Sequence, residues 1–156
     1  SRSNSLNRTM ACVVLVALAI GGSALSQSGQ ISRVTTPGVA KRMATMNAAN
    51  TAMKTLTDMM GGRVFFDRKH AQQARRDLMK ATGDIPGAFR KPHVDPLSNA
   101  RSTIWQNWRD FRNRAKIAQR ASRSLDTDSL SDLRKSLPKL LRACLNCHGV
   151  YREPVN

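Results

Sequence analysis

The sequence has few cysteines, few aromatic residues and few acidic residues. Its three cysteines do not provide a framework of several disulfides, and one of them, Cys12, lies in an apolar run near the N-terminus. Aromatic residues make up 4% of the chain, so the interleaved aromatic platform of a nucleic-acid-binding surface is missing. No apolar run reaches the roughly 20 residues of a comfortable membrane span, and no pattern of strands is convincing.

The shortage of acidic residues leaves a large positive charge. Lysine and arginine number 26 against 10 acidic residues, of which only Glu153 is glutamate, and the formal net charge is +16. Such an excess favours anionic partners, namely acidic redox proteins, anionic lipid headgroups or, without specificity, nucleic acid. We expect no nucleic-acid partner, because no recognition motif is present. A solvated basic surface is the simplest interpretation of the charge.

Residues 1–26 resemble a secretory signal peptide. Arg2 and Arg8 supply the positive charge, residues 11–20 form the apolar run, and small residues precede a cleavage position near Ser26. We expect cleavage there, which removes two cations and no acid and leaves a mature chain of charge +14. We therefore expect no stable membrane insertion, with an uncleaved N-terminal anchor as the alternative.

The most informative stretch lies near the other end of the chain. Cys144-Leu145-Asn146-Cys147-His148 is the C-x-x-C-H signature for covalent attachment of c-type haem. In such sites two thiols add across the porphyrin vinyl groups and the imidazole ligates the iron. On a helix, residues at i, i+3 and i+4 share one face. The same face continues an apolar stripe made of Leu130, Leu133, Leu137, Leu140, Cys144, Cys147 and Tyr151.

Three other uses of these cysteines fit the sequence less well. A zinc site needs four ligands, and outside the motif only His70 and His93 remain, unpaired in the sequence. A thioredoxin-type dithiol belongs beside a strand–helix–strand pattern. A plain disulfide leaves His148 unexplained. Haem attachment is the preferred interpretation, and it agrees with export, because bacteria attach haem outside the inner membrane.

One helical domain is predicted over residues 37–156, after a flexible lead-in at residues 27–36. Its first helix begins at Pro37, with Thr36 as the N-cap, because proline fits the first turn of a helix. Gly61-Gly62 ends this helix.

The second helix is shorter in this prediction. Val64-Phe65-Phe66 forms a hydrophobic corner, Asp67 caps the helix, and the helix runs to about Ala81. Residues 83–87 contain two glycines and a proline and are expected to break it, before an ordered loop that extends to Asp95-Pro96.

The third and fourth helices carry the clearest apolar faces. Ser98 is the candidate cap of the third helix, and Ser129 with Asp132 forms a capping box that opens the fourth. Pro138 lies inside the fourth helix and is expected to kink it. The sequence therefore predicts an all-α, antiparallel four-helix bundle with covalently attached haem near the C-terminal helix. Since the haem is part of the core, we expect the apoprotein to fold poorly.

With the attachment motif at the end of four helices, the chain resembles the class II c-type cytochromes, the cytochrome c-prime family, over residues 38–153. The tail is similar to that family's C-x-x-C-H-x-x-Y-R ending, and Pro138 and the strong positive charge depart from the family pattern. Further matching positions are Arg42, Met46, Met53, Phe66, Ile104, Trp105 and Phe111.

The resemblance implies roles for particular residues. Cys144 and Cys147 are the thioether sites, and His148 is the proximal iron ligand. Arg152 is expected to approach the proximal imidazole or a haem propionate, and Arg42 to pair with a propionate. Solvated surface charge is the alternative for both arginines.

Met46 falls where the family faces the distal side of the iron. The family contains low-spin members with a methionine ligand and high-spin members with an apolar, open or blocked distal site, and methionine occurs at this position in both. A methionine–histidine pair raises the reduction potential, because the soft thioether favours ferrous iron. Met43, Met53, His70 and His93 are weaker candidates for the same ligand.

These roles predict a periplasmic monohaem electron carrier with redox partner proteins, some of them acidic, and with a possible homodimer. The alternative is a five-coordinate, cytochrome c-prime-like protein that binds nitric oxide or carbon monoxide. We expect no enzymatic activity, because the first helix offers no distal acid or base for peroxide chemistry. A structural bundle without haem is the remaining alternative.

Overall fold

The structure is a computed structural model that describes Gly29, Ile31 and residues 33–155. The expected signal peptide, residues 1–26, lies outside the described residues.

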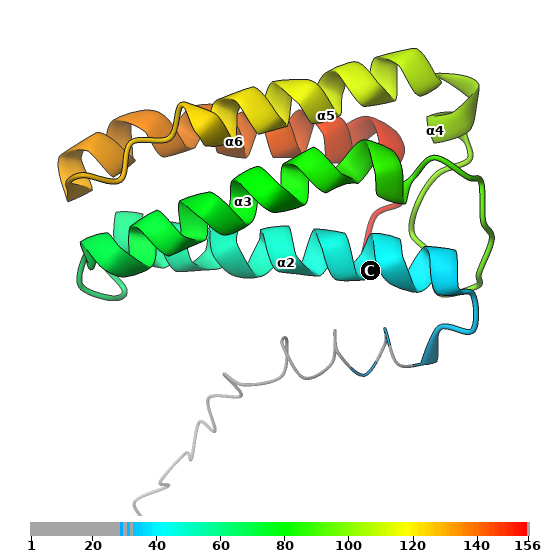
Figure 1. Cartoon of the computed structure of the whole chain (residues 1–156), viewed down its shortest axis with the longest axis horizontal. Coiled ribbons are helices and arrows are strands. Elements are labelled where there is room, and N and C mark those ends of the chain that lie inside the picture. Colours follow the sequence, from blue (N-terminus) through cyan, green and yellow to red (C-terminus); the bar gives the residue numbers. More distant parts are fainter. Residues whose placement is uncertain (1–28, 30, 32, 156) are drawn as a thin grey trace, which may run out of the picture.

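Four long helices and one short helix make up the described fold (Figure 1). Helix α2 packs against α3, α3 against α5, α5 against α6, and α6 against α2, so the long helices close into a ring. The described residues contain no strand beyond an isolated bridge between Ala100 and Arg152. The predicted all-α four-helix bundle is confirmed. The helices are α2 (Pro37–Met60), α3 (Arg68–Ala88), α4 (Thr103–Gln106), α5 (Trp108–Arg123) and α6 (Leu130–Tyr151).

The predicted bounds of α2 are confirmed, although its N-cap works differently from the prediction. Thr36 is in extended conformation before Pro37, but its hydroxyl makes no cap bond and instead donates to the Val94 carbonyl at 3.2 Å. At the other end, Gly62 has φ +74°, a left-handed conformation that favours glycine. The following corner is not packed as predicted, because Val64 and Phe65 are exposed and only Phe66 contacts the core.

Helix α3 is longer than predicted. Asp67 caps it by accepting from the His70 amide at 2.8 Å, but the helix continues past Ala81 to Ala88 with Pro86 inside it. Proline at this position removes one backbone hydrogen bond in the last turn. Burial of Ile85 and Ala88 against the rest of the bundle outweighs that local cost.

The predicted third helix is divided into two. Ser98 does not cap it: its hydroxyl accepts from the Ala100 amide in a turn, and the helix begins only at Thr103. Asn107, with φ −116° and ψ 41°, separates α4 from α5. This break lets side chains on both sides of Asn107 reach the same group of aromatic rings, which include Trp105 and Trp108.

Helix α6 begins as predicted. The Ser129 hydroxyl caps it by accepting from the Asp132 amide at 3.1 Å. In place of the second bond of a capping box, the Ser129 hydroxyl donates to the Asp132 carboxylate at 2.7 Å. Pro138 lies inside the helix without ending it, and the helix ends at Tyr151 rather than at Pro154.

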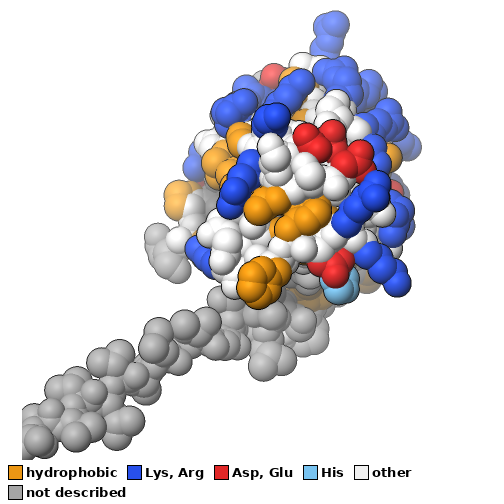
Figure 2. All heavy atoms as spheres, turned by 90° about the vertical axis from the view of Figure 1, so that its left-hand side faces the viewer, with side chains coloured by type: hydrophobic (Ala, Val, Ile, Leu, Met, Phe, Trp, Pro, Cys, Tyr) orange, Lys and Arg blue, Asp and Glu red, His pale blue; other side chains and the backbone are white. Residues whose placement is uncertain are grey.

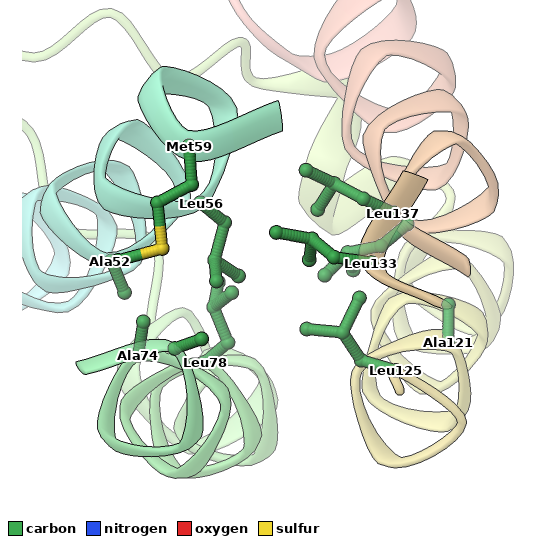
Figure 3. Packing of buried hydrophobic residues seen from close by; sticks show 11 residues of the cluster. Ala52, Leu56, Met59, Ala74, Leu78, Ala121, Leu125, Leu133 and Leu137 are labelled. Carbon is green, nitrogen blue, oxygen red and sulfur yellow. The ribbon is translucent and has the colours of Figure 1, made fainter. Parts of the chain in front are cut away.

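The core consists of two clusters, which occupy different parts of the bundle. In the first, the leucine cluster, leucines from opposite helix pairs point toward one another, as Figure 3 shows for Leu56 and Leu78 facing Leu133 and Leu137. The second, the aromatic cluster, is built from Ile85, Ala88, Phe89, Ile104, Phe111, Ala115 and Tyr151.

Residues 89–102 form an ordered connection between α3 and α4, which begins and ends later in the chain than the loop predicted to extend to Asp95-Pro96. The buried Asp95 carboxylate accepts from the Leu97 amide within this loop and from the amides of Thr35 and Thr36. Thr35 and Thr36 end the segment that was expected to be a flexible lead-in, and here they are held by these hydrogen bonds. Across the described part of the chain, none of the helices combines the length and the apolar character needed to span a bilayer.

Replacing Ser129 with alanine is expected to lower the free energy of unfolding by about 1 kcal/mol, because the Asp132 amide then loses its cap. Urea unfolding of the haem-loaded protein measures the change as a shift of the midpoint at constant slope. The matched control is Ser131→Ala, an exposed position in the same turn, for which we expect less than about 0.5 kcal/mol. Equal shifts for the two variants would contradict the capping role.

Candidate functional site

The motif cysteines lie where the two core clusters meet. Cys144 packs against the leucine cluster, and Cys147, one turn later, packs against the aromatic cluster. Both thiols are free, and both are half-buried together with His148. Because these three residues occupy positions i, i+3 and i+4 of α6, they share one helix face.

Burial sets the protonation of this group. It raises the pKa of the Cys144 thiol and raises that of Cys147 to about 11, so both sulfurs keep their protons at neutral pH. Burial, and then the charge of Arg152, lower the pKa of the His148 imidazole. A neutral imidazole is the form that ligates a metal.

Arg42 is buried, with 2% of its surface exposed. Its guanidinium donates to the main-chain carbonyls of Lys91 and His93, and it lies 4.7 Å from the ring centre of Trp105 and 5.4 Å from that of Phe89. Burial lowers its pKa, and the carbonyls and rings compensate part of that cost. The Nε atom is buried and has no hydrogen-bond partner among the described residues.

Met46 lies one turn after Arg42 on α2 and packs against the aromatic cluster, as Cys147 does from α6. Met53, two turns further along, packs against the leucine cluster, as Cys144 does. The aromatic cluster of Cys147 thus includes one methionine of α2, Met46, whereas the leucine cluster of Cys144 includes Met59 and Met60 besides Met53. Met43 is half-buried and belongs to neither cluster.

The two remaining histidines lie away from this arrangement. His70 is exposed in the first turn of α3, beside Asp67. His93 is exposed in the 89–102 loop, where its imidazole lies so close to Gly38 that a Cβ atom at this glycine would overlap it. Neither position brings a ring nitrogen to the two core clusters. Among the described residues, no three His, Cys, Asp or Glu side chains gather in a group that could hold a metal ion.

Arg152 follows α6 as its C-cap, in extended conformation, with an exposed side chain. Its amide donates to the His148 carbonyl at 3.0 Å, and its charge contributes to lowering the pKa of His148. The guanidinium is therefore close enough to act on the imidazole electrostatically. The structure does not bring Arg152 and Arg42 into a shared hydrogen bond.

A hydrogen-bonded group beside Cys147 was not predicted from the sequence. The Tyr151 hydroxyl donates to the Asp110 carboxylate at 2.5 Å, and Arg114 donates to the same carboxylate at 2.8 Å. Arg114 also donates to the main-chain carbonyl of Asn146, inside the motif, at 3.2 Å. The i, i+4 spacing of Asp110 and Arg114 was a visible signal, but their contact with α6 was not.

The aromatic cluster is held together by directed contacts. Phe111 lies at its centre, with the Phe89, Trp108 and Tyr151 rings 5.2, 5.5 and 5.4 Å away, and the Trp105 indole donates to the Phe89 carbonyl at 2.7 Å. These rings form a rigid apolar wall next to Cys147.

These residues fit a covalently attached haem. Two protonated thiols and a neutral imidazole share one face of α6 and border apolar clusters, which suits an apolar porphyrin. The orphaned Arg42 Nε is a buried cationic donor that lacks an acceptor, which suits a propionate carboxylate. Haem would thus be held by Cys144 and Cys147, with iron ligation from His148.

Tyr151 is the only tyrosine, so its ionisation is directly observable. Burial and the Asp110 carboxylate raise its pKa to about 12, compared with about 10 for a free tyrosine. The folded state holds this proton more tightly, so the associated stability is complete below about pH 10 and is lost as the pH rises toward 12. Ultraviolet difference titration is expected to show the phenol ionising near pH 12.

The Asp110→Asn variant is expected to lower that midpoint, because it removes the carboxylate charge beside the phenol. Asp77→Asn, an exposed position on α3, is the control and is expected to leave the midpoint in place. An ordinary midpoint near 10 in the parent protein would show that the Tyr151–Asp110 contact does not form in solution.

Comparisons with known proteins agree on one family. The model of the cytochrome c′ family matches residues 38–152. Cytochrome c′ from Rhodopseudomonas palustris superposes with a TM-score of 0.70 at 21% identity and covers 78% of this chain and 99% of its own. Cytochrome c′ from Rubrivivax gelatinosus gives a TM-score of 0.66 at 19% identity, with 74% and 94% covered.

A third solved structure is the nitric oxide complex of a single-residue variant of cytochrome c prime from Alcaligenes xylosoxidans. It gives a TM-score of 0.66 at 21% identity, with 75% of this chain and 94% of that chain covered. At these identities the structural matches show the fold alone. No curated protein matches the chain at a significant level. The family model covers most of the bundle, including Arg42, Met46 and the C-x-x-C-H motif. The chain therefore belongs to the cytochrome c′ family, whose cofactor is covalent haem c with its iron.

Proposed function

We propose that the chain is a periplasmic monohaem cytochrome that carries electrons, with His148 as the proximal and Met46 as the distal iron ligand. The observation that carries the proposal is the placement of Met46 in the same cluster as Cys147, one turn after Arg42. Helices α2 and α6 pack against each other, so the thioether and the motif approach one region of the core from facing helices.

Haem c supplies one-electron iron chemistry when bound. His148 offers a neutral imidazole for the iron, and the thioether of Met46 favours the ferrous state. Arg42 and Arg152 provide cations for the propionates. Phe89, Phe111 and the other rings of the aromatic cluster exclude water, and a dry surrounding is one of the means by which proteins tune a reduction potential.

Export is part of the proposal. Members of the family are periplasmic, and the sequence of residues 1–26 fits a signal peptide that is cleaved near Ser26. The mature chain would then consist of the lead-in and one cytochrome domain over residues 37–156. Recovery of the haem-loaded protein from the cytoplasmic fraction would contradict export.

The partners follow from the family and the charge. Family members are often homodimers and are mostly gas-binding or electron-carrying haem proteins rather than classical enzymes. We propose redox partner proteins for this chain, and its excess of basic residues favours acidic ones.

The second candidate function is the binding of nitric oxide or carbon monoxide at a five-coordinate iron. The solved structures with this fold include nitric oxide and carbon monoxide complexes of cytochrome c prime variants from Alcaligenes xylosoxidans. In this alternative Met46 packs beside the iron without ligating it, as methionines at helical spacing often do in cores.

Met46→Ala decides between the two functions. If Met46 ligates, the parent protein shows a low-spin spectrum, and the variant becomes high-spin, has a lower reduction potential and binds carbon monoxide at once when reduced. Met53→Ala is the matched control, because it removes the same side chain from α2 in the leucine cluster and is expected to keep the low-spin spectrum.

Two results would contradict Met46 ligation. A parent protein that is already high-spin and binds carbon monoxide immediately would favour the gas-binding function. A Met46→Ala spectrum identical to the parent's would return Met46 to a packing role, and a change confined to Met53→Ala would assign the ligand to that residue instead.

A further inference from the structure

A row of positive charge runs along the outward face of α5. The residues recur at i, i+3, i+7, i+11 and i+14 and all are exposed. At about 100° per residue they fall within an arc of about 80°, opposite the buried Phe111 and Ala118. We call this row the α5 ridge, and its members are Arg109, Arg112, Lys116, Arg120 and Arg123.

The ridge opposes the stability of its own helix. Its members are neighbours at i, i+3 or i, i+4, where like charges repel. On other helices a cation has an acid at this spacing: Lys54 pairs with Asp58 on α2, and Lys80 pairs with Asp84 on α3. Within the described part of the chain, no acid forms an ion pair with a ridge residue. Arg120 and Arg123 lie in the last turn, where cations favour the helix dipole, but the other three ridge residues bring the helix no such gain.

A shallow hollow borders the first half of the ridge. Three ridge cations line it, and its one acidic residue, Asp110, is already bonded to Arg114 and Tyr151. The lining residues are Gln106, Asn107, Trp108, Arg109, Asp110, Arg112, Asn113 and Lys116. The half-buried Trp108 indole stacks on Phe111 with ring centres 5.5 Å apart, so it is held rigidly beside the cations. Cations next to a fixed tryptophan are the side chains that favour the headgroup region of a bilayer.

We propose that the α5 ridge binds the surface of a bilayer that contains anionic phospholipid. Helix α5 lies on the outside of the bundle (Figure 1), and the ridge extends over about 21 Å in a straight row. Such a row can contact several headgroup phosphates of one flat surface at once. The guanidinium and ammonium groups donate to the phosphate oxygens.

A lipid surface fits the ridge better than an acidic protein does. Tight protein interfaces depend on several aromatic or apolar anchors at their centre. Among the described residues next to the ridge, Ile117 is the one large apolar side chain classed as exposed, at 41%, and Trp108 is half-buried against Phe111. The net charge of +14 expected for the mature chain adds long-range attraction to an anionic surface. Basic side chains also surround the end of the bundle that Figure 2 shows, whereas acidic ones gather in a few places there.

The test is sedimentation of the haem-loaded protein with vesicles of phosphatidylglycerol and phosphatidylcholine in equal parts, at about 0.1 M salt, where distant charges are screened. Each cation near an anionic surface contributes about fivefold to binding. The triple variant R112Q/K116Q/R120Q is therefore expected to lose about 100-fold. The control K135Q/K139Q/R142Q removes the same charge from the outward face of α6 and is expected to lose less than about threefold.

Three results would overturn the proposal. The parent protein could fail to bind the vesicles, the two triple variants could lose binding equally, or the ridge could retain polyglutamate but not vesicles, which would assign it to an acidic protein. Absorption spectra and circular dichroism that match the parent's confirm that each variant is folded. Haem coordination is measured separately, so failure here leaves the proposed electron-carrier function unaffected.

Discussion

The packing of α2 against α6 is the contact on which the rest of the site depends. It places Met46 with Cys147 in the aromatic cluster and Met53 with Cys144 in the leucine cluster. Slipping α6 by one turn would move its motif by about 5.4 Å and would separate these pairs. The cap at Ser129 and the hydrogen bonds that Asp110 and Arg114 make with α6 hold this helix at both ends, so they set the position of the motif.

The loop 89–102 joins the start of α2 to the end of α6. Arg42 of α2 and Thr36, which precedes this helix, bond to loop carbonyls. Asn99 and Arg101 bond to the main chain at Glu153 and Tyr151. Burying the Arg42 guanidinium is costly, and two carbonyls with two aromatic rings offset only part of the cost. Its remaining Nε donor explains why a carboxylate-bearing cofactor would stabilise this end of the bundle.

The parts of the fold that could be predicted from the sequence are those fixed by neighbouring residues. The caps at Asp67 and Ser129 depend on contacts three residues away, and the C-x-x-C-H motif depends on one turn of helix. The end of α3 could not be predicted, because burial of Ile85 overrides the local effect of Pro86.

The contacts that connect the site to the rest of the chain could not be predicted for a related reason. Arg42 bonds to a loop about fifty residues later, and Asp110 bonds to Tyr151 forty-one residues later, so tertiary packing alone brings them together. The most direct measurement of the central claim is mass spectrometry of the tryptic peptide that contains Cys144 and Cys147, taken from exported, mature protein. The account predicts one haem bound through both sulfurs; a colourless protein with two free thiols would contradict it.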